Sequence, residues 1–113
     1  MVTYDESHKK LTESGIDDIK KVLFSDDVYQ IRQVLFCLDF YLDPYYKQRL
    51  PYENEIFELL QELVINSRDD EVINDCLQLL GDYACVSLQI LEQGFDWMKD
   101  SRKPAAKYVL NQP

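Results

Sequence analysis

Apolar residues recur at helical spacing along most of this 113-residue chain. The clearest run is residues 25–44, SDDVYQIRQVLFCLDFYLDP, in which apolar side chains return every three or four positions until an Asp-Pro pair. This spacing predicts an amphipathic helix, because residues three and four apart share one helix face. Further apolar residues, such as Phe36 and Phe40, fall on its other sides. We therefore expect this helix to be the most buried one.

The same spacing predicts further helices on either side of this run. One begins near Ser14, and two more cover about 53–66 and about 70–84. Another ends near Gly94, and the last helix holds Pro104 in its first turn. Residues 44–53 contain two prolines and are predicted to form a loop or a short helical turn. Residues 1–10 have no periodicity, and residues 1–13 are expected to form a flexible start. The pattern predicts an all-α fold of five to six helices.

Serine and aspartate residues mark where these helices are expected to begin. Ser14 and Ser67 are each followed three residues later by aspartate, a spacing typical of a capping box. Ser25 can accept from free backbone N–H groups, and the two aspartates after it complement the positive end of the helix dipole. We therefore expect the three serines to be the cap residues.

The sequence also repeats itself. A shift of 43 positions places Asp26 on Asp69, Phe36 on Leu79 and Asp39 on Asp82. Such a shift keeps the cap, the apolar positions and the turn between helices together. Periods of about 40–47 residues built from helix pairs are typical of HEAT and armadillo repeats.

Three segments carry a resemblance to HEAT-like repeats: SDDVYQIRQVLFCL, SRDDEVINDCLQLL and SRKPAAKYVL. The resemblance implies one domain, 1–113, folded as a short α-solenoid stack. Its repeats would be 14–50 and 51–95, and 96–113 would be a truncated third unit or cap. An irregular helical bundle with coincidental self-similarity is the alternative fold.

Charge is the strongest feature of the composition. Twenty-one acidic and twelve basic residues give a net charge of −9. This charge disfavours nucleic acid and anionic membranes and favours basic partners, although solubility alone is the alternative explanation. The locally basic end, which holds Lys99, Arg102, Lys103 and Lys107, is expected to neutralise acids elsewhere on the scaffold or the helix end.

The compartment is predicted to be the cytoplasm. No apolar run approaches the ~18–20 residues that span a bilayer, and the first ten residues do not form a secretory signal. Cys37, Cys76 and Cys85 fit no disulfide framework and are expected to be reduced structural residues.

Candidate chemistry is sparse. The single histidine, His8, lies in the segment without periodicity, and the chain has no phosphate-binding glycine loop and no nucleophile elbow. The cysteine spacing matches no zinc site. We therefore expect no enzymatic activity, no cofactor and no bound metal.

The surface holds the candidate binding residues. Glu55, Glu58 and Glu62 form one acidic stripe, and Glu71, Asp75 and Asp82 form another. In a repeat stack, inner helices lie side by side, so one acidic groove would collect Asp39, Asp43, Glu71, Asp75 and Asp82. Tyr45 and Tyr46 adjoin the first inter-repeat loop, and tyrosine is enriched at interfaces. The alternatives are a solvated acidic face and tyrosines that cover the edge of the core.

In size, charge and helical-repeat style the chain resembles small acidic bacterial immunity proteins of contact-dependent-inhibition and polymorphic-toxin systems. The resemblance implies a non-enzymatic module that neutralises a basic toxin domain, such as a nuclease, through its acidic surface. A general adaptor that binds through tyrosine-rich apolar contacts is the alternative. A small enzyme or ligand-binding domain would require a deep pocket with a perturbed ionisable residue. The sequence does not predict an oligomeric state.

Overall fold

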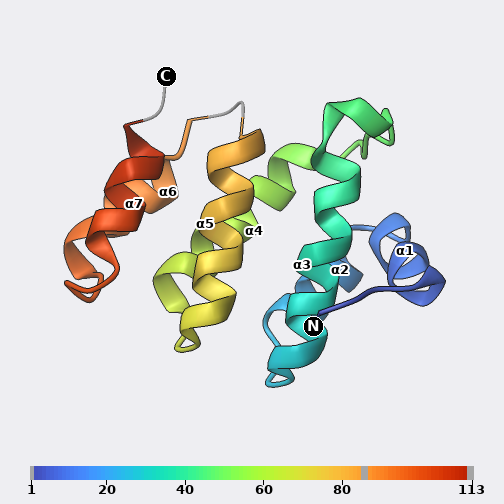
Figure 1. Cartoon of the computed structure of the whole chain (residues 1–113), viewed down its shortest axis with the longest axis horizontal. Helices are drawn as coiled ribbons and strands as arrows, with labels where there is room; N and C mark the ends of the chain where they lie inside the picture. Colours follow the sequence, from blue (N-terminus) through green and yellow to red (C-terminus); the bar gives the residue numbers. More distant parts are fainter. Residues whose placement is uncertain (1, 85–86, 112–113) are drawn as a thin grey trace. The chain divides into compact units, whose positions relative to one another are not determined.

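Helices account for all regular secondary structure in the parts that the computed structural model describes, residues 2–84 and 87–111 (Figure 1). The α-helices are α1 (Glu6–Glu13), α2 (Ile16–Leu23), α3 (Val28–Leu42), α4 (Glu53–Asn66), α5 (Asp70–Tyr83), α6 (Gln89–Gly94) and α7 (Lys103–Leu110). Two 3₁₀ turns accompany them, η1 (Pro44–Tyr46) and η2 (Phe95–Trp97). The all-α prediction is confirmed, with one α-helix more than expected. None of the helices in these ranges has the length and apolarity that a membrane span needs.

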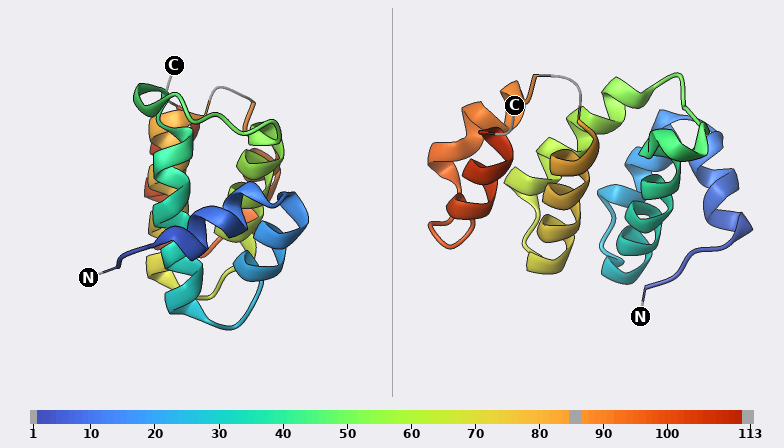
Figure 2. Two further views of the ribbon diagram at one scale, coloured as in Figure 1. Left: turned by 90° about the vertical axis from the view of Figure 1, so that its right-hand side faces the viewer. Right: turned by 45° about the horizontal axis from the view of Figure 1, so that its top comes forward.

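The chain divides into two compact units, residues 1–56 and 57–113, and the boundary falls within α4. In the first unit, α1 and α2 both pack against α3. Figure 2 shows that α1 runs across α3 rather than alongside it. The core of this unit consists of fully buried side chains, which are Ile19 and Leu23 from α2 and Val34, Leu35 and Leu38 from α3.

The additional helix is α1, within the segment that had no apolar periodicity. The Asp5 carboxylate accepts the backbone N–H of Ser7 at 2.8 Å, and the Asp5 N–H donates to Nδ1 of His8 at 3.0 Å. This reciprocal arrangement is a capping box with histidine in the place of the usual glutamate. The only buried side chain of α1 is polar Thr12, whose hydroxyl donates to the His8 carbonyl at 2.9 Å. A helix that buries threonine leaves little apolar signal in the sequence.

The predicted cap at Ser14 is wrong. Ser14 ends α1, where its hydroxyl donates to the Leu11 carbonyl at 2.6 Å and to Asp18 at 2.7 Å. The N-cap of α2 is Gly15, whose φ of 135° lies in a region that side chains rarely adopt. The glycine turns the chain sharply between α1 and α2. The sequence had predicted a helix only after this turn and a flexible segment before it.

The turns before α3 and α5 share one hydrogen-bonding pattern, in which aspartate is the cap and serine supports it. Ser25 and Ser67 each accept the N–H of the aspartate two residues later, at 3.4 and 3.2 Å. Asp27 and Asp69 then each accept an N–H three residues later, at 3.1 and 3.0 Å. These aspartates are the N-caps, which corrects the assignment to serine. The two caps lie 42 positions apart in the sequence, from 27 to 69.

Burial in the two helices follows the same 42-residue offset. The buried residues Ile31, Val34, Leu35, Cys37 and Leu38 of α3 correspond to Ile73, Cys76, Leu77, Leu79 and Leu80 of α5. The burial patterns of α3 and α5 therefore match at a shift of 42 positions and not at the predicted 43. A shift of one residue rotates a position by about 100° around the helix axis. It therefore changes which exposed residues of the two helices correspond. Asp39 corresponds to Gly81, and Asp82 corresponds to Phe40.

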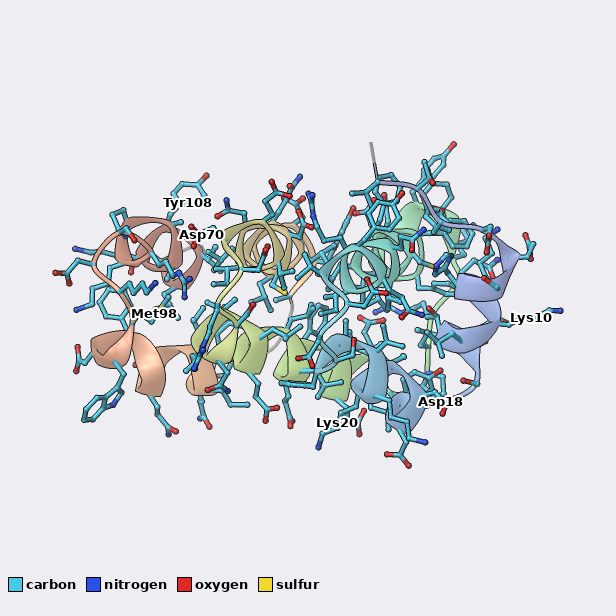
Figure 3. The ribbon with its side chains drawn as sticks, turned by 90° about the horizontal axis from the view of Figure 1, so that it is seen from below. Lys10, Asp18, Lys20, Asp70, Met98 and Tyr108 are labelled. Atoms are coloured by element: carbon cyan, nitrogen blue, oxygen red, sulfur yellow. The ribbon has the colours of Figure 1, made fainter. Side chains whose placement is uncertain are left out.

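The second unit places α5 and α6 against α7. Buried Met98 lies between the α6–η2 segment and α7 (Figure 3). Helix α6 ends at Gly94 as predicted, but Gly94 has φ −87° and does not form a left-handed C-cap. A Cβ atom there would lie 2.4 Å from Cδ1 of Ile65, so glycine permits the close approach of α6 to α4.

Two polar side chains fix the helices of the second unit. Gln61 is buried, and its amide oxygen accepts the Leu91 N–H at 3.0 Å while its nitrogen donates to the Phe57 carbonyl at 3.3 Å. Arg102 donates to Asp70 at 3.0 Å and to the Ser67 carbonyl at 3.1 Å. Arg102 therefore neutralises an acid on another element, as predicted for the basic end.

We expect Gln61→Leu to destabilise the fold by about 1–3 kcal/mol, because the buried Leu91 N–H would lose its acceptor. The same change at exposed Gln93 is the matched control and should stay within about 0.5 kcal/mol. Urea unfolding followed by circular dichroism measures both. Equal free energies of unfolding for the two variants would show that the Gln61 bond does not support α6.

Candidate functional site

Helix α3 is buried on one side only. Ile31, Val34 and Leu38 face the core, whereas Phe36 is 51% exposed, and Tyr29 and Val28 are also exposed. The apolar residues that were predicted on the other sides of this helix are thus partly exposed. The helix is apolar on more of its surface than α1 and α2 cover. Exposed apolar side chains that lie together are typical of interaction sites.

Four rings form a continuous row from the core to the solvent, which we call the aromatic row. Buried Tyr41 meets Phe40 edge-on at 5.2 Å, Phe40 meets Tyr46 at 4.8 Å, and Tyr46 meets Tyr45 edge-on at 5.3 Å between ring centroids. The exposed fraction rises to 46% at Tyr46 and 81% at Tyr45. These separations are those of favourable aromatic pairs. The outer rings are therefore held in place by a buried one.

The inner end of the row is tied to α1. The Tyr41 hydroxyl donates to the Glu13 carboxylate, and the Tyr52 hydroxyl donates to the Thr12 carbonyl. Burial raises the pKa of Tyr41, and the hydrogen bond to Glu13 and its negative charge raise it further. The phenol therefore keeps its proton in the folded chain at neutral pH and anchors the row.

The outer end of the row is set by the 3₁₀ turn η1. Pro44 occupies its first turn, and the Asp43 carboxylate caps it by accepting the Tyr45 N–H at 2.9 Å. The turn ends at Lys47, which has a left-handed φ of 58°. The prediction of a loop or a short helical turn is confirmed. Asp43 and Tyr45, both predicted as binding residues, thus belong to one turn.

The N-terminal segment adds a further ring. Tyr4 packs against Phe36 with 5.4 Å between ring centroids. The pKa of Tyr4 is raised by burial and by Cys37, and Asp39 and Tyr46 also raise it while Lys9 lowers it. Tyr4 is therefore within electrostatic reach of groups on α1, α3 and η1. We call the shared patch the α3 surface, defined as Tyr4, Phe36, Phe40, Tyr45 and Tyr46 with Lys9, Asp39 and Asp43.

Four of the predicted binding residues, Asp39, Asp43, Tyr45 and Tyr46, lie on this α3 surface. In the second unit, Glu71, Asp75 and Asp82 follow one another along one face of α5, with Glu71 and Asp82 exposed. On α4, Glu55 and Glu58 are exposed and Glu62 is half-buried. One groove that joins the acids of both units stays a prediction.

Four residues of this surface were not predicted from the sequence: Tyr4, Lys9, Phe36 and Phe40. A signal for the two phenylalanines was present, because α3 carries more apolar residues than one buried face needs. Tyr4 and Lys9 gave no signal, since their positions depend on how α1 crosses α3. Trp97, which is 87% exposed in the second unit, was also missed.

The described residues contain two buried thiols and an open cleft, but no cluster of metal ligands. No three histidine, cysteine or acidic side chains are arranged there as metal ligands. Cys37 and Cys76 are free and buried, and burial raises the pKa of each thiol. Cys85 lies outside the described residues. An open cleft of 250 Å³ in the second unit is lined by Glu92, Phe95, Asp96, Lys107, Leu110 and Asn111.

Comparisons with protein-family models, with curated proteins and with solved structures find no match to this chain. The function is therefore inferred from the surface itself.

We expect Tyr41→Phe to reduce the loss of stability at alkaline pH. The pKa of Tyr41 is raised above 10.0 in the folded chain, so above about pH 10 the unfolded chain releases a proton that the folded chain keeps. Stability therefore falls as pH rises through this range, by up to about 1.4 kcal/mol per pH unit for one group. Urea unfolding at about pH 9 and about pH 11 should show a shallower fall for the variant than for the wild type. Equal slopes would mean that the Tyr41 phenol is not held by the fold.

Proposed function

We propose that this chain is a non-enzymatic module that binds a basic protein through the α3 surface. The observation that carries the proposal is the aromatic row, which leads from buried Tyr41 to Tyr45 at 81% exposure. Tyrosine provides a large contact area with few rotatable bonds, so rings already held in place lose little entropy when a partner covers them. Asp39 and Asp43 add negative charge at the same place.

The more specific form of this proposal is an immunity protein that neutralises a toxin domain. Its support is the net charge of −9 on a chain of 113 residues, together with the resemblance in size and helical style. Exposed acids on α4 and α5, including Glu58, Glu71 and Asp82, extend the negative field. Such a field accelerates association with a basic toxin domain. A nuclease, whose cleft must attract phosphates, has the charge that this surface complements.

The fold that we propose for this function is a short HEAT-like stack of the helix pairs α2–α3 and α4–α5. The shared Ser-Asp turns and the matching burial of α3 and α5 at a 42-residue offset support it. In such repeats the corresponding helices line one face. Both helices would then offer their exposed residues to the same partner.

A general adaptor that binds through apolar contacts is the second candidate. The pairing of Tyr45 with Tyr46 at 5.3 Å on the outermost part of the α3 surface favours it. Binding would then persist at high salt and would be lost in Tyr45→Ala. The immunity form instead requires strong salt dependence, because charge drives the encounter.

We expect Asp39→Lys to weaken binding to the native partner by more than about 1.4 kcal/mol, or tenfold in Kd. The partner would be identified by pull-down from the native host, and toxins encoded beside this gene would be tested first. Asp100→Lys is the matched control, since Asp100 is highly exposed and lies in the second unit. It makes the same change in net charge outside the residues that define the α3 surface.

The measurement is the rate and affinity of association by surface plasmon resonance over a range of salt concentrations. We expect the association rate to fall steeply with salt and the control to retain affinity. Rates that are independent of salt, or equal losses in the two variants, would contradict binding through the acidic α3 surface. Co-expression with the neighbouring toxin should restore growth if the immunity form is correct.

A further inference from the structure

The face of the Phe40 ring already holds a positive charge. The Lys9 ammonium lies 5.0 Å from the ring centroid, within the distance at which a cation is attracted to an aromatic face. Lys9 comes from α1 and Phe40 from α3, so the contact joins two elements. The centre of the α3 surface thus has the geometry of a cation site, and a side chain of the same chain occupies it.

The neighbours of Phe40 hold this ring in position. Tyr41 meets it at an interplanar angle of 87°, and Tyr46 is tilted by 37°. Tyr41 is itself anchored by its bond to Glu13. The ring plane is therefore set before any partner arrives, which lowers the entropic cost of binding.

Lys9 also has a second partner, Glu6, at 3.4 Å between Nζ and Oε1. When Lys9 leaves the ring, its charge stays paired with this carboxylate one helical turn away. The exchange of Lys9 for another cation therefore does not require an unpaired ammonium.

We propose that the Phe40 face is a specificity site for arginine, and that a guanidinium from the basic partner replaces Lys9 there. The inference rests on the proposed function and names the partner chemistry of the same surface. A guanidinium is planar and weakly hydrated and stacks on aromatic faces, whereas an ammonium is compact and strongly hydrated. The net charge of −9 and Asp39 on the same surface favour a cationic partner over a neutral one.

The test compares Lys9→Ala with Lys10→Ala, and the probe is a short blocked peptide in which arginine alternates with alanine. Both variants remove one positive charge from α1, but the Lys10 side chain points away from the molecule (Figure 3). Only Lys9→Ala uncovers the ring. We expect it to bind the peptide about 2- to 5-fold more tightly than Lys10→Ala, by calorimetric titration.

Two further comparisons identify the ring as the site. Phe40→Leu should lower the affinity for the arginine peptide by about 2- to 5-fold. The wild type should bind the arginine peptide more tightly than a matched lysine peptide, and Phe40→Leu should bind the two peptides equally. A citrulline peptide, which keeps the shape of arginine without its charge, should bind more weakly than the arginine peptide. Thermal unfolding checks that Phe40→Leu remains folded, and the Lys9 and Lys10 pair tests the site without altering any ring.

Equal affinities for Lys9→Ala and Lys10→Ala, or equal binding of the citrulline and arginine peptides, would overturn the arginine site. Neither result would affect the proposed function, because the salt dependence of native partner binding does not require Lys9. Conversely, salt-independent binding of the native partner would contradict the proposed function, and the peptide titrations would still report on the Phe40 face alone.

Discussion

Helix α3 has more apolar surface than its neighbours can bury, and this constraint shapes the first unit. Its inner side packs on α1 and α2, and Val34, Cys37 and Leu38 are fully buried. The outer side keeps Phe36 in solvent, where apolar surface is unfavourable. The fold orders this excess through edge-on and tilted contacts between rings, from Tyr41 through Phe40 to the turn η1. A surface that is both apolar and ordered is suited to binding.

Polar residues hold the rest of the chain with few but specific bonds. The same serine-aspartate turn begins α3 and α5, so these two helices start with the same cap hydrogen bond. In the second unit, where α6 is short, Gln61 supplies an acceptor from inside the core. Arg102 ties the start of α7 to the turn before α5. Acid-rich sequences can thus form a stable helical fold, because their acids cap helices or remain in water.

Much of the fold could be predicted from the sequence, because α3, α4 and α5 follow clear helical periods and end at turn residues. Helix α1 could not, since it buries Thr12 and is capped by Asp5 with His8, neither of which gives an apolar signal. The similarity of the two helix starts could be read from the sequence, but the adjacent aspartates allow a shift of 42 (Asp27 on Asp69) or 43 (Asp26 on Asp69). Only the hydrogen bonds identify Asp27 and Asp69 as the caps. For the site, Tyr45 and Asp43 were predicted from local sequence. Lys9 and Tyr4 reach the surface through tertiary packing, which no local pattern encodes.

The account therefore depends on the α3 surface being the part of the molecule that a partner covers. Nuclear magnetic resonance of the aromatic side chains, recorded with and without the native partner, tests this most directly. We expect the resonances of Phe36, Phe40, Tyr45 and Tyr46 to shift on binding, while those of Trp97 and Tyr108, exposed in the second unit, change little. Shifts confined to Trp97 and Tyr108 would contradict the account.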